Sequence, residues 1–304
     1  MTNGPDKFNL MAFSPTNRNA SLMNLFYDDQ DDTVHQRRGS RILYWLDDLG
    51  AKPISECDPD DSGFLFSVAG SISDYEDLVA DRPELSDRAD ERLPLMSLES
   101  ILDALIAGSV ELPMSRTWRL AWNEAIPEDI TYPLFVRASD SSLKLDGSIS
   151  RVRNINELLL EAAELRRLLG WNALVIAREW KECVQSGTST YGTLPQEIRV
   201  WVIEGKSFAW SFQHLNAIPS PVGFPPSQAD LRELSELADR AATAFKSRCL
   251  FVDFAREVER GWTFVDAGPG SCASSDHEGV FKAVASRLIE KKFAFHNDSV
   301  GGVF

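Results

Sequence analysis

The sequence has few cysteines, and none of them are spaced as a metal-binding pair. Its 304 residues include four cysteines, Cys57, Cys183, Cys249 and Cys272, which lie far apart and form no CxxC motif. This distribution argues against a disulfide scaffold and a structural zinc site, and it is typical of a reducing compartment. We therefore expect a cytoplasmic protein.

Long apolar runs and several common catalytic motifs are also missing. No stretch approaches the roughly 20 apolar residues that span a bilayer, and residues 1–7 do not resemble the start of a signal peptide. No GxSxG, HExxH or Walker sequence occurs, and His214 and His277 have no partner at ligand spacing. We therefore expect no membrane contact, and we assign both histidines to surface or packing roles.

Positive charge is scarce in the first third of the chain. The formal net charge is −15, and residues 1–112 contribute −13 of it, from 9 Lys/Arg against 22 Asp/Glu. Such a surface disfavours binding to nucleic acid or to an anionic membrane. Two interpretations stay open: a solubilising surface, or a docking face for a protein partner.

The length is about twice that of a typical domain, and the apolar content of 43% with eight Trp suffices for a packed core. We expect an acidic N-terminal α/β unit over 1–112, a second region over 113–292 that divides at 177/178, and a loose tail over 293–304. In the first unit the patterns predict helices at 34–49 and 97–107 and a strand at 64–68.

The second region has a sharper pattern. Asn156 is expected to cap a long amphipathic helix that Gly170 closes. Helices are predicted at 118–125, 156–169, 230–247 and 278–292, strands at 132–137, 174–180, 197–203 and 207–215, and a polar loop, a candidate substrate lid, at 181–196.

Two aspartates lie in near-identical apolar segments, FVDFA over 251–255 and FVDAG over 264–268. The turn Glu259-Arg260-Gly261 between them predicts a hairpin, which places Asp253 and Asp266 opposite each other, or offset by one if Gly261 forms a bulge. Facing carboxylates repel one another, so a neutralising group is expected. A divalent cation with oxygen ligands, bound beside phosphates, is the candidate.

Five segments, in this order, resemble the signature of the ATP-grasp superfamily. They are PLFVR (133–137), KLDGS (144–148), VIAREW (175–180), EIRVWVIEGK (197–206) and the two aspartate strands. The resemblance covers roughly 113–290. It is closest to the clade that has arginine in place of the first-strand lysine, because Arg137 stands there and Lys144 follows.

The resemblance implies an ATP-grasp-like α/β (α+β) fold, in which two subdomains with antiparallel sheets enclose a nucleotide. It also implies an ATP-dependent ligase that joins a carboxylate to an amine or thiol through an acyl phosphate, on an amino acid, peptide or protein tail. The implied site residues are Arg137, Lys144 and Arg199 on the phosphates, with Arg199 and Lys144 catalytic, Gly147 and Ser148 in the phosphate loop, Glu179 and Trp180 on the nucleoside, and Asp253 and Asp266 on Mg2+.

These residue types suit that chemistry. Guanidinium groups form planar pairs of hydrogen bonds with phosphate oxygens, a flexible lysine can follow a moving loop, and glycine lets the backbone approach a phosphate closely. The alternative is structural: Arg137 and Arg199 could form ion pairs at the ends of strands, with Glu197 as the partner of Arg199.

One position departs from the family pattern. The usual last-strand motif is an acidic residue, a spacer and Asn, whereas this chain has Asp266-Ala267-Gly268. Because Gly268 has no side chain, it cannot supply a second magnesium ligand. That departure and the acidic N-terminal part favour the competing hypothesis, a non-catalytic nucleotide-binding module for interaction or assembly.

Overall fold

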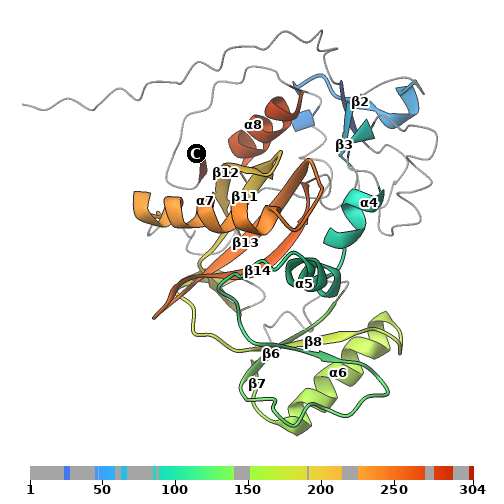
Figure 1. Ribbon diagram of the computed structural model, residues 1–304, viewed down its shortest axis with the longest axis vertical. Helices are drawn as coiled ribbons and strands as arrows, with labels where there is room; N and C mark the ends of the chain where they lie inside the picture. Colours follow the sequence, from blue (N-terminus) through green and yellow to red (C-terminus); the bar gives the residue numbers. More distant parts are fainter. Residues whose placement is uncertain are drawn as a thin grey trace, which may run out of the picture.

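The computed structural model describes residues 24–27, 45–46, 48–58, 63–66, 85–86, 89–139, 151–189, 192–213, 225–270, 277–289 and 301–304. Within these ranges the chain is a mixed α/β protein built on a five-stranded sheet, two four-stranded sheets and a hairpin, which confirms the predicted class. Figure 1 shows the five-stranded sheet at the centre, with a smaller sheet and α6 (Ile155–Leu169) below it. In the described part, no helix is long and apolar enough to cross a bilayer.

The central sheet is antiparallel throughout and has the strand order β14-β13-β11-β12-β15. Its strands are β11 (Glu197–Ile203), β12 (Lys206–Phe212), β13 (Cys249–Glu257), β14 (Gly261–Pro269) and β15 (Gly301–Val303). Alternate side chains of β11 face opposite sides of the sheet. Val200 packs in the core beneath α7 (Gln228–Ala242), whereas Trp201 packs in the core beneath α8 (Glu278–Leu288).

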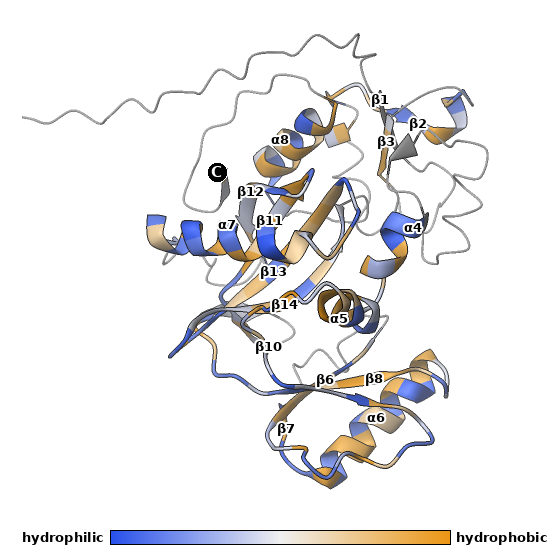
Figure 2. Ribbon diagram, in the orientation of Figure 1, coloured by the Kyte–Doolittle hydropathy of each residue, from blue (hydrophilic) through white to orange (hydrophobic). Residues whose placement is uncertain are grey.

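Helices cover both faces of this sheet. In α7, the buried residues Leu234, Leu237, Ala238 and Ala241 follow helical spacing, and Ser227 and Asp230 form a capping box at its start. Figure 2 shows the hydrophilic residues that α7 carries between them. On the opposite face, α8 buries Phe281 against Trp201.

The small sheet is also antiparallel, with the order β5-β8-β6-β7. It comprises β5 (Thr117–Leu120), β6 (Leu134–Ala138), β7 (Arg151–Val152) and β8 (Val175–Glu179), and α6 packs on it. The cap of α6 is Asn154, which accepts from the amides of Asn156 and Glu157. The prediction that Asn156 is the cap is therefore wrong by two residues, although Gly170 ends the helix as expected.

N-terminal residues contribute to both cores of the central sheet. A parallel sheet of order β2-β1-β3-β4 combines β1 (Asn24–Tyr27), β2 (Lys52–Pro53), β3 (Gly63–Phe66) and β4 (Leu85–Ser86). Phe66 of β3 contacts Phe281 of α8. On the other face, Leu105 of α5 (Leu98–Ala107) joins the core beneath α7. The division at residue 112 stays a prediction.

Several predicted elements take another form. The helix expected at 118–125 is wrong, because Trp118 and Leu120 lie in β5, whose backbone pairs with β8. The loop expected at 181–196 contains a hairpin, β9 (Gln185–Ser189) and β10 (Gly192–Pro195). The end of the expected loose tail forms β15 beside β12. Most of the helix predicted at 34–49 lies outside the described residues. The remaining short elements are η2 (Ile54–Glu56), α4 (Ala89–Arg92) and η3 (Leu93–Leu95).

Candidate functional site

Three charged residues are aligned across adjacent strands of the central sheet. Arg199 of β11 pairs in register with Asp253 of β13, which in turn pairs with Asp266 of β14. Residues opposite each other in register point to the same face of a sheet. The two aspartates therefore face each other as predicted, and the register shifts immediately after Asp253 rather than at Gly261.

Asp253 is held by both of its oxygens. The Arg199 guanidinium donates from Nε to Oδ1 at 2.8 Å and from Nη2 to Oδ2 at 2.7 Å. Only 6% of the Asp253 side chain and 12% of the Arg199 side chain are exposed. Burial raises the pKa of Asp253 to about 6, and Arg199 acts in the opposite direction, so the carboxylate is ionised at neutral pH. Burial acts to lower the pKa of Arg199, but Asp253 outweighs it and the pKa is raised.

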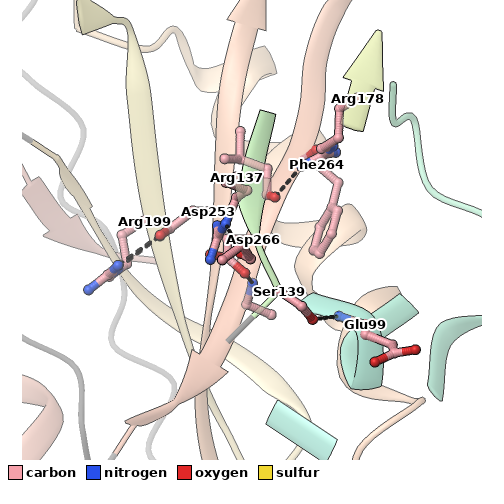
Figure 3. Close-up of polar contacts among 11 residues, drawn as sticks. Glu99, Arg137, Ser139, Arg178, Arg199, Asp253, Phe264 and Asp266 are labelled. Atoms are coloured by element: carbon pink, nitrogen blue, oxygen red, sulfur yellow. Dashed lines mark hydrogen bonds and ion pairs between the residues drawn. The ribbon is translucent and has the colours of Figure 1, made fainter. Parts of the chain in front are cut away.

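Asp266 has a guanidinium partner from the other sheet. Arg137 of β6 donates from Nη1 to Asp266 Oδ2 at 2.7 Å, and the Ala267 amide donates to Oδ1 at 2.9 Å (Figure 3). The expectation that a cation must neutralise the facing carboxylates is therefore wrong, because two guanidinium groups do so here. The structural alternative for Arg137 and Arg199 describes these ion pairs, with Asp253 as the carboxylate bound to Arg199.

Arg178 of β8 is a site residue that the sequence reading did not single out. Its guanidinium donates to the carbonyl oxygens of Phe264 at 2.8 Å and of Val265 at 2.5 Å (Figure 3). Burial, together with the charge of Arg137, lowers its pKa to about 10. The available signal was a charged residue inside an otherwise apolar strand. Arg178 fixes the backbone of β14 immediately before Asp266.

Glu179 and Trp180 lie where the chain leaves the small sheet. Glu179 pairs with Lys181 at 2.8 Å, and Trp180 donates from its indole N–H to Glu182 at 3.3 Å. The guanidinium of Arg151 lies 5.3 Å from the centre of the Trp180 ring. The predicted contacts of Glu179 and Trp180 with a nucleoside stay a prediction.

The predicted phosphate loop, with Lys144, Gly147 and Ser148, lies outside the described residues. Ser139, which ends the described part of the chain before this loop, is anchored to α5. Its carbonyl oxygen accepts from the Leu98 amide at 2.8 Å, and its hydroxyl accepts from the Glu99 amide at 3.0 Å (Figure 3). The start of the loop is therefore fixed to the first turn of α5.

The two aspartates differ in how well they suit a metal ion. Their oxygens are the donors that Mg2+ prefers, and one or two carboxylates with phosphate oxygens are a common set. Asp266 suits this role because its side chain is 22% exposed, whereas both oxygens of Asp253 are bound to Arg199. Among the residues that the structure describes, no group of three or more His, Cys, Asp or Glu could hold a metal.

Comparisons with known proteins agree with this architecture. A family model for an ATP-grasp domain, the third family of its clade, matches residues 74–288. A D-alanine–D-alanine ligase from Bacillus anthracis, solved in complex with ATP, is 14% identical with a TM-score of 0.59, and the match covers 88% of this chain and 97% of the ligase. No curated protein matches.

Two further solved structures share the fold. A carboxyaminoimidazole ribonucleotide synthase from Aspergillus clavatus, complexed with ATP, has a TM-score of 0.60 at 14% identity, over 90% of this chain and 78% of the synthase. A RimK domain ATP-grasp protein from Sphaerobacter thermophilus has a TM-score of 0.56 at 14% identity, over 88% of this chain and 98% of its own. Because the family model spans most of the sequence, the chain belongs to the ATP-grasp superfamily, as the five segments predicted.

Proposed function

We propose that this chain is an ATP- and Mg2+-dependent ligase that joins a carboxylate to an amine or a thiol through an acyl phosphate. The observation that carries the proposal is the group of two arginines and two aspartates where the small sheet meets the central sheet of an ATP-grasp fold. Phosphoryl transfer needs positioning and charge neutralisation more than covalent chemistry from the protein. A group of this composition supplies both.

In this proposal the guanidinium groups bind phosphate oxygens of ATP. Arg137 exchanges its bond to Asp266 for a phosphate oxygen, because the partly exposed Asp266 can be hydrated or bound by another cation. Arg199 stays on the buried Asp253 and turns its other N–H groups toward the transferred phosphate. Asp266 is the residue that would hold Mg2+, which would neutralise phosphate charge when bound.

The remaining roles follow from the family pattern. Lys144, Gly147 and Ser148 would close over the triphosphate, and Glu179 and Trp180 would hold the nucleoside. The carboxylate substrate would be an amino acid, a peptide or a protein tail. The hairpin β9–β10 leads through Gln196 into β11, and therefore toward Arg199, which supports it as the element that covers this substrate.

ADP release tests the proposal. The chain is incubated with ATP, Mg2+ and pools of amino acids or peptides, and ADP is measured with and without each pool. A ligase forms ADP only when a carboxylate is present, and hydroxylamine traps the acyl phosphate as a hydroxamate. If ATP binds but no pool raises ADP above background, the ligase assignment is rejected.

A second candidate function is a nucleotide-binding module for interaction or assembly, without turnover. Gly268 at the usual Asn position favours it, as does the acidic N-terminal part, which could dock a protein partner. This candidate predicts stabilisation by ATP with Mg2+, no ADP with any carboxylate, and recovery of a partner that is lost when acidic residues of the N-terminal part are neutralised.

A further inference from the structure

A phenylalanine lies against the guanidinium group of Arg199. The guanidinium carbon is 3.7 Å from the centre of the Phe251 ring, so the ring covers one face of the planar group. Asp253 binds one edge of the same group through Nε and Nη2. Arg199 is therefore held by an aromatic face and a carboxylate edge, both provided by β13.

Gly268 makes room for that ring. Phe251 and Gly268 pair in register across β13 and β14. A Cβ added at position 268 would lie 2.4 Å and 2.5 Å from two carbons of the Phe251 ring, which is closer than carbon atoms can approach. Any side chain at 268 must therefore displace the ring. This steric conflict gives Gly268 a role of its own, separate from the missing metal ligand.

We infer that Phe251 is a positioning residue for Arg199, and that Gly268 is required because the Phe251 ring leans over it. The inference rests on the proposed function for the identity of the anion that Arg199 binds, a phosphate group. A cation over an aromatic face is attracted to it, and most strongly away from water. A guanidinium fixed in one plane loses little further freedom when it binds a planar pair of oxygens.

The competing explanation is that Phe251 is only a packing residue. The ring is partly buried and packs against the core cluster that contains Trp201 and Phe281. Phe281 is a matched control, because it belongs to the same cluster, is fully buried and contacts only other aromatic rings among its described ring contacts. Replacing either phenylalanine by leucine removes a ring from one core, but only Phe251→Leu removes it from Arg199.

The experiment is a double-mutant cycle on the binding of ATP with Mg2+, measured by calorimetry. We expect Phe251→Leu to weaken binding about tenfold and Phe281→Leu to leave it unchanged after both stabilities are measured. In an Arg199→Lys background, Phe251→Leu should have little further effect. Equal affinities for Phe251→Leu and wild type, or additive losses in the cycle, would overturn the positioning role.

Gly268→Ala provides an independent steric test. Alone it should weaken binding as much as Phe251→Leu does, because the new methyl group moves the ring off Arg199. In the Phe251→Leu background it should change nothing. A loss of similar size in both backgrounds would mean that Gly268 acts through something other than the ring.

A measurement without nucleotide separates this inference from the proposed function. In 15N-labelled protein, the ring current of Phe251 should shift the Arg199 Nε–H resonance, which Arg199→Lys identifies by its disappearance. The shift should be lost in Phe251→Leu and kept in Phe281→Leu. If wild type does not bind ATP but the shift behaves in this way, the proposed function fails and the positioning of Arg199 stands. If ATP binds and the shift is absent, the positioning fails alone.

Discussion

The Arg137 guanidinium lies 2.7 Å from Asp266, a residue 129 positions later in the chain, and this bond joins the small sheet to β14 of the central sheet. Arg178, on the neighbouring strand of the small sheet, reaches the backbone of the same strand. The two contacts differ in kind. Arg137 binds a carboxylate that is partly exposed and can exchange partners, whereas Arg178 is buried and binds carbonyl oxygens.

Arg137→Ala is expected to weaken ATP binding by about tenfold to a hundredfold, because one or two charge-assisted hydrogen bonds to phosphate are lost. Calorimetry with ATP and Mg2+ measures the change. Arg116→Ala is the matched control, since Arg116 forms an exposed ion pair with Asp129 at the start of β5. An unaltered dissociation constant for Arg137→Ala would remove this residue from the site.

Asp253→Asn is expected to destabilise the protein without ligand by about 3–5 kcal/mol, because it removes the negative charge that balances the buried Arg199. The sequence alone leads to the opposite expectation, a gain in stability as two facing carboxylates stop repelling each other. Urea unfolding decides between them. Asp239→Asn is a suitable control, since Asp239 pairs with the exposed Lys206. A gain in stability would show that repulsion outweighs the ion pair.

Much of the fold could be predicted from local patterns. The strand predicted at 197–203 has the bounds of β11, and the helix predicted at 156–169 differs from α6 by one residue at its start. The hairpin of Asp253 and Asp266 was also accessible, because its strands are adjacent in sequence. In contrast, β5 has only four residues, too few to establish a period, and its pairing with β8 decides its conformation.

The partners of the aspartates could not be predicted in the same way. Arg137 reaches Asp266 only because the small sheet packs beside β14, and no local pattern records that contact. The same holds for Arg178 and the backbone carbonyls that it binds. Gly268 could be recognised from the sequence as a departure from the family, but its steric reason lies in the orientation of the Phe251 ring.

Asp266→Asn is expected to remove the Mg2+ dependence of ATP binding while leaving most of the stability without ligand intact. Its side chain is 22% exposed and the amide can still accept from Arg137, so the folded state loses little. Melting temperatures with ATP, in the presence and absence of Mg2+, measure the effect. Asp253→Asn serves as the comparison. If Asp266→Asn keeps the full magnesium-dependent shift, the ion is held elsewhere.

Arg178→Met is expected to loosen the junction between the two sheets more than it lowers the overall stability. Replacing a buried guanidinium by an apolar side chain of similar length also removes its desolvation cost, so the global free energy of unfolding should change little. The hydrogen bonds to Phe264 and Val265 are nevertheless lost, and β14 is then joined to the small sheet mainly through Arg137 and through the contacts of Pro113 and Met114 with Phe264.

Hydrogen exchange measured by mass spectrometry tests this expectation on peptides that cover β14 and β8. Exchange in both should accelerate in Arg178→Met, and ATP binding should weaken because Asp266 and Arg137 are no longer held in register. Arg119→Met is the control, since Arg119 forms partly exposed ion pairs with Glu99 and Asp103 on α5. If exchange in β14 is the same in Arg178→Met and wild type, the remaining contacts hold the two sheets together without Arg178.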